Sequence, residues 1–253
     1  MIKSHTNNII SNLTPALAWV GLLFVSLLFV SCSDDDDDAN EWENWQTKND
    51  TYWSDLYTQT QQRIAAGDTT WKIIPSWTLV DQHPSDGSSA INLAPTDYII
   101  VHVEESGRGT TSPMYTDSVR IHYLGRMIPS PTYTAGLIFD ASYDYTQGYN
   151  LATMRPYDSR TGSFIKGFTT ALLNMHKGDR WMVYIPYRLA YGTTTPGSTS
   201  TTTKTGSYSS TSTSSTIQPC SNLIFDITLV DFFKPGEKIP VVYSKQNEWG
   251  GED

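Results

Sequence analysis

Residues 163–192, SFIKGFTTALLNMHKGDRWMVYIPYRLAYG, constrain the fold of this chain more than any other segment. Between residues 168 and 175 the apolar side chains recur at i, i+3, i+4 and i+7, which is the spacing of one face of a short helix. Lys-Gly-Asp at 177–179 interrupts that pattern and predicts a turn. From residue 181 to 185 the side chains alternate with period two, as in a strand, and Pro186 ends it. The segment therefore predicts a short helix packed on a sheet.

Three further motifs flank this segment. SVRIHYLG at 118–125, IFDASY at 138–143 and NLIFDITLVD at 222–231 are typical of strands or strand ends. Together with residues 163–192 they resemble the motifs of the FKBP family of peptidyl-prolyl cis-trans isomerases, in the family's order. The resemblance implies an α+β fold in which a curved, mostly antiparallel sheet wraps around one short helix, here with an N-terminal helical extension. It also implies peptidyl-prolyl isomerase activity that needs no cofactor.

The resemblance also carries a set of site residues onto this sequence. As catalytic residues it implies Tyr123, Phe139, Asp140, Ile165, Tyr191 and Phe225. As substrate-binding residues it implies Tyr149, Phe164, Phe168 and Ile217. Phe168 stands where the family usually has a Trp at the floor of the pocket, so we expect a floor that is still aromatic but smaller. Without the resemblance, Tyr123 would be interpreted as a core tyrosine and Asp140 as a turn residue.

This reaction needs no covalent nucleophile, and a ring of aromatic side chains can favour it by supplying an apolar pocket. An Xaa-Pro bond interconverts across a barrier of about 18–20 kcal/mol, and amide resonance holds its planar ground state. The twisted transition state loses that charge separation, so an apolar pocket with little water favours it. The five histidines show no metal-ligand spacing, and no metal site is expected. The alternatives are a non-catalytic FKBP-like lipoprotein that binds peptides or acts as a chaperone, and a purely structural lipoprotein.

The first 40 residues are typical of an exported, lipid-anchored protein. Residues 1–31 contain an apolar run from Ala16 to Val30, which is shorter than the ~20 residues that a spanning helix needs. Phe-Val-Ser-Cys at 29–32 resembles a bacterial lipobox, which implies a cleaved signal peptide and acylation of Cys32. A transmembrane anchor or an uncleaved signal is the alternative. The acidic segment 32–40 is expected to be a solvated tether. The lipobox resemblance implies a protein of the bacterial cell envelope, anchored at the outer membrane on its surface or periplasmic face.

The rest of the chain divides by composition. Residues 41–104 predict an N-terminal helix followed by strands, and 105–233 predict the isomerase domain with a Ser/Thr-rich insertion at 193–216. Residues 234–253 predict a polar tail. The helix is expected to pack on the isomerase domain, and binding a partner or forming a dimer is the alternative. The net charge of −9 argues against a nucleic-acid partner. The FKBP resemblance implies proline-containing polypeptides as partners, and the lipobox-like sequence implies the membrane, with the oligomeric state left open.

Overall fold

The computed structural model describes residues 41–80, 92–151, 157–196 and 217–241. The expected signal peptide, Cys32 and the acidic tether lie outside these ranges, as do most of the Ser/Thr-rich insertion and the end of the tail.

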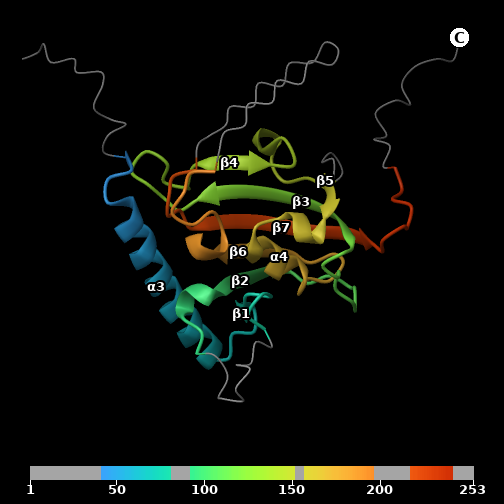
Figure 1. The fold of residues 1–253 in the computed structure, drawn as a ribbon, viewed down its shortest axis with the longest axis horizontal. Coiled ribbons are helices and arrows are strands. Elements are labelled where there is room, and N and C mark those ends of the chain that lie inside the picture. The colour runs from blue at the N-terminus through green and yellow to red at the C-terminus, as the bar shows by residue number, and fades with distance from the viewer. Residues whose placement is uncertain (1–40, 81–91, 152–156, 197–216, 242–253) are drawn as a thin grey trace, which may run out of the picture. The chain divides into compact units, whose positions relative to one another are not determined.

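Seven strands of the described residues form one sheet, and every strand pairing in it is antiparallel (Figure 1). The order along the sheet is β1-β2-β6-β7-β3-β4, and β5 pairs with β3. The last strand of the described residues, β7, therefore lies inside the sheet, between β6 and β3. The strands are β1 (Trp71–Pro75), β2 (Tyr98–Glu105), β3 (Ser118–Met127), β4 (Ile138–Ala141), β5 (Tyr157–Arg160), β6 (Arg180–Ile185) and β7 (Leu223–Phe233).

The short helix α4 (Lys166–Leu172) packs on this sheet, against β2 and β6. Its apolar face is buried, because Phe168, Ala171 and Leu172 are each at most 2% exposed. The sheet residues Val183 and Ile227 belong to the same buried cluster. Burying a large apolar side chain contributes about 1.5–3 kcal/mol, so this contact between helix and sheet forms the main core. The expected α+β architecture, a mostly antiparallel sheet around one short helix, is confirmed.

The N-terminal helix α3 (Trp45–Ala65) packs on the same domain. The indole Nε1 of Trp45 donates to Ser221 Oγ at 2.8 Å, and that of Trp53 donates to the carbonyl oxygen of Pro95 at 3.0 Å. Of the two roles that the sequence leaves open for this helix, packing on its own domain is the one seen here. Short 3-10 helices connect the larger elements: η1 (Pro95–Asp97), η2 (Tyr145–Gln147), η3 (Thr161–Ser163) and η4 (Tyr187–Leu189).

Among the helices of the described ranges, none combines the length and the apolar character that crossing a bilayer requires.

Candidate functional site

A cavity of about 240 Å³ opens between α4 and the strands β3, β4 and β7. Three strands, the start of α4 and the turn after η4 contribute to it, so its lining comes from segments far apart in the sequence. All the expected site residues except Tyr149 and Ile217 line it, and Ser163 joins them. The lining residues are Tyr123, Phe139, Asp140, Ser163, Phe164, Ile165, Phe168, Tyr191 and Phe225.

The strand register explains how three of these side chains meet. On β3, Gly125 lies opposite Phe225 of β7 on one side and opposite Asp140 of β4 on the other. A Cβ at position 125 would lie 2.6 Å from Phe225 Cε1 and 2.7 Å from Phe139 Cζ. The absence of a side chain at Gly125 therefore makes the room into which both aromatic rings fit.

The floor of the cavity is the ring of Phe168, which is 2% exposed. Phe164 stacks on it with ring centroids 4.5 Å apart, while Phe225 and Tyr123 meet it edge-on at 5.0 Å and 5.9 Å. Phe139 in turn meets Phe225 edge-on at 5.6 Å. Aromatic pairs in these geometries contribute about 0.5–1.5 kcal/mol beyond their buried area, so the wall is a mutually supported set of rings.

Polar groups stand at the rim of this apolar wall. The hydroxyl of Tyr123 donates to Asp140 Oδ2 at 2.8 Å. Burial, together with the nearby Asp140 carboxylate, raises the pKa of Tyr123 and also that of Tyr191 above the usual value. Both hydroxyls are therefore protonated at neutral pH; that of Tyr123 donates to Asp140, and that of Tyr191 can donate to a ligand. Within the described residues, no three His, Cys, Asp or Glu side chains are placed to hold a metal ion.

Two expected site residues lie elsewhere. The hydroxyl of Tyr149 is 2.7 Å from Thr228 Oγ1, and the guanidinium of Arg180 lies 3.9 Å from the centre of its ring. Tyr149 is thus not among the described residues that line the cavity. Ile217 is 6% exposed and belongs to the hydrophobic core, and it is not among the described residues that line the cavity.

Tyr157 is an aromatic neighbour of the site that the sequence analysis missed. It begins β5, pairs with Ile121 of β3, and meets the ring of Tyr123 edge-on at 5.8 Å. Its side chain is 45% exposed, so it stands at the margin of the cavity. Four tyrosines lie between Ser142 and Ser163, and only the register of β5 on β3 distinguishes this one from the others.

Comparisons with known proteins point to one family. Residues 109–230 match the profile of the family described as FKBP-type peptidyl-prolyl cis-trans isomerase. The chain is 34% identical to the macrophage infectivity potentiator of Trypanosoma cruzi over 52% of its own length and 51% of that protein. It is 33% identical to FK506-binding protein 1A of Neurospora crassa over 38% of its own length and 70% of that protein. The chain thus spans only about half the length of the trypanosomal protein.

Among solved structures, the chain is similar to a peptidyl-prolyl cis-trans isomerase of Pseudomonas syringae pv. tomato. The two sequences are 28% identical, and the TM-score is 0.37. The match covers 53% of this chain and 74% of that one.

Proposed function

The chain belongs to the FKBP-type peptidyl-prolyl cis-trans isomerase family, and from this premise we propose that it catalyses cis–trans isomerisation of Xaa-Pro bonds in polypeptides. The observation that carries this proposal is the aromatic cavity with the hydroxyl-bearing side chain of Tyr191 in its lining. Its clients are proline-containing segments of envelope or secreted proteins, whose folding it assists.

The mechanism follows from the chemistry of the amide. The prolyl ring enters the cavity against Phe168 and is shielded from water by the surrounding rings. A twisted amide has lost its resonance and its charge separation, so this environment favours it over the planar ground state. The backbone N–H of Ile165, at the start of α4, and the hydroxyl of Tyr191 then donate to the substrate's carbonyl groups and fix its orientation.

An isomerisation assay with Xaa-Pro peptides tests the proposal. We expect the full chain to accelerate isomerisation above the thermal rate, and Asp140→Ala and Tyr191→Ala each to lower kcat/KM by about tenfold. That factor corresponds to the loss of one hydrogen bond of about 1.4 kcal/mol. Tyr145→Ala is the matched control, because Tyr145 is a similarly exposed tyrosine that does not line the cavity.

A non-catalytic peptide-binding or chaperone role is the second candidate, and the smaller floor at Phe168 favours it. Saturable binding of a proline-containing peptide by wild type, lost in Asp140→Ala and without any acceleration of isomerisation, would replace the catalytic proposal by this one.

We further propose that Cys32 carries a lipid that anchors the protein in a bacterial envelope, at the outer membrane. The support is the lipobox-like sequence at 29–32 and the acidic segment that follows it. In a bacterial host, labelled fatty acid is expected to enter wild type but not Cys32→Ser, and the variant is expected to leave the membrane fraction. Equal labelling of both proteins would refute the anchor.

A further inference from the structure

A pair of buried asparagines joins helix α3 to the residue that precedes strand β7. Asn49 is 0% exposed and Asn222 is 2% exposed. The backbone N–H of Asn222 donates to Asn49 Oδ1 at 2.7 Å, and its side-chain Nδ2 donates to the carbonyl oxygen of Asn49 at 2.6 Å. Each asparagine thus satisfies buried polar groups of the other, and removal of either side chain would leave a buried group without this partner.

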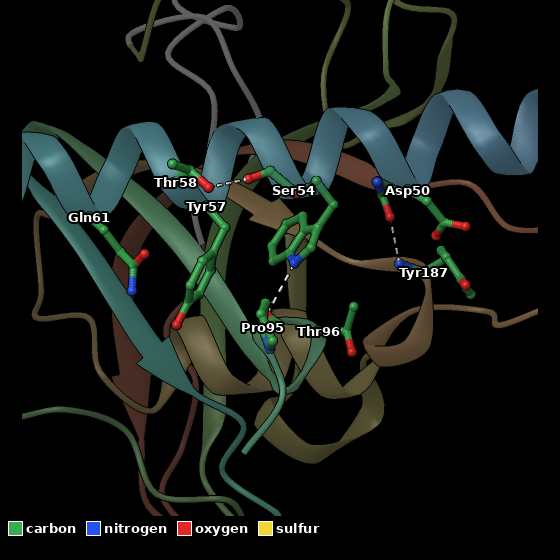
Figure 2. Close-up of a pocket in the computed structure, with 10 residues that line it drawn as sticks. Asp50, Ser54, Tyr57, Thr58, Gln61, Pro95, Thr96 and Tyr187 are labelled. Carbon is green, nitrogen blue, oxygen red and sulfur yellow. Dashed lines mark hydrogen bonds between the residues drawn. The ribbon is translucent and has the colours of Figure 1, made fainter. Parts of the chain in front are cut away.

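Asn222 continues this chain of bonds to the segment that carries Tyr191. Its side-chain Oδ1 accepts from the backbone N–H of Tyr187 at 2.9 Å, a bond drawn beside the labelled Tyr187 in Figure 2. The carbonyl oxygen of Tyr187 accepts from Ala190 at 3.0 Å and from Gly192 at 2.8 Å. Asn222 therefore holds the first residue of a turn, 187–192, whose internal hydrogen bonds converge on that residue.

The other end of the turn is held by the same stretch of chain. The carbonyl oxygen of Gly192 accepts from the backbone N–H of Cys220 at 2.9 Å. The next residue, Ser221, accepts the indole N–H of Trp45 on α3. Residues 220–222 thus bind both ends of the turn on one side and two side chains of α3 on the other.

Tyr191 depends on these backbone bonds for its position. Its side chain is 39% exposed, so packing restrains it less than it restrains the buried rings of the cavity. The following residue, Gly192, has φ +69°, in the left-handed region that favours glycine. The turn is held by the buried side chains of Tyr187 and Leu189 and by the hydrogen bonds at its ends, and those hydrogen bonds fix the backbone that carries Tyr191.

We propose that Asn49 and Asn222 are positioning residues for the site, because they connect α3 to the turn that places Tyr191 at the cavity. Helix α3 is thereby part of the support of the site as well as a cover for the sheet. Tyr187 and Asn222 also line a groove of about 440 Å³ beneath α3, so the link runs along one wall of that groove (Figure 2). The catalytic consequence rests on the proposed isomerase function, whereas the structural link does not.

Amide hydrogen exchange on the full chain tests the link independently of activity. In Asn49→Ala we expect the amides of Tyr187 and Gly192 to exchange roughly ten- to a hundredfold faster than in wild type, after correction for the change at Ile227 in the central strand. The matched control is Thr60→Ala, which removes another fully buried polar side chain of α3 that bonds only within the helix. In the control, the exchange rates of the two amides should change by no more than that of the Ile227 amide.

A milder variant covers the case in which Asn49→Ala does not fold. Trp45→Phe keeps an aromatic ring but removes the donor to Ser221. We expect the amide of Gly192 to exchange faster relative to that of Ile227, by a smaller factor than in Asn49→Ala. Uniform or unchanged exchange in the variants that fold would overturn the proposal. Loss of exchange protection confined to Tyr187 and Gly192, together with a fall in kcat/KM, supports the proposal. If the variants lose protection only at Tyr187 and Gly192 but wild type shows no turnover, the link is kept and the isomerase function is rejected.

Discussion

Replacing Phe168 with Ala is expected to lower the free energy of unfolding by about 3–5 kcal/mol. The ring is 2% exposed and is in contact with Phe164, Phe225 and Tyr123, so its removal takes away buried area and several aromatic pairs at once. Because Tyr123 and Phe225 are held by strands β3 and β7, their rings can close only part of the space. Urea unfolding followed by circular dichroism measures the effect.

Two control variants separate stability from function. Leu172→Ala truncates another fully buried residue of α4 that does not line the cavity, and is expected to cost about 2–5 kcal/mol. Under conditions where both variants are folded, only Phe168→Ala should lose isomerase activity, because only it removes the floor. Phe168→Leu should recover much of the stability. A loss below about 1 kcal/mol for Phe168→Ala would contradict the role of this ring as the centre of the core.

The sequence predicted the fold wherever a local pattern and burial agree. The apolar period at 168–175 and the alternation at 181–185 appear as α4 and β6, since a helix and a strand each expose one repeating face. Strand β1 is at the edge of the sheet and ends at Pro75. Proline removes a backbone donor, so its place in a sheet can be inferred from the residue alone.

The parts that could not be predicted depend on long-range register. Nothing local distinguishes Tyr149 from Tyr157, because both are tyrosines in a polar stretch; the pairing of β5 with β3 places Tyr157 beside Tyr123. Likewise, Asn49 and Asn222 are 173 positions apart, and neither stands in a motif. Their bond arises from how α3 packs on the domain, which depends on the whole fold.

Gly125→Ala is expected to reduce kcat/KM on the order of 100-fold, because a shift of about 1 Å in a substrate-positioning group can cost that much. The new Cβ would overlap the rings of Phe139 and Phe225, whose edges lie within 3 Å of its position. The rings would have to shift, and a shift toward the cavity would occupy the space that we assign to the prolyl ring. Crowding of a packed site typically costs about 1–3 kcal/mol of stability, which leaves this variant open to assay in the folded state.

Leu124→Ala is the matched control for this prediction. Leu124 is the preceding residue of β3, and its side chain lies on the opposite face of the strand, since Cβ atoms alternate along a strand. We expect its kcat/KM to remain within about twofold of wild type, because no lining residue of the cavity is altered. Binding of a proline-containing peptide, measured by titration calorimetry, should weaken in Gly125→Ala and not in Leu124→Ala. Full activity of Gly125→Ala would mean that the substrate does not enter between Phe139 and Phe225, and the reaction would then have to be placed outside this cavity.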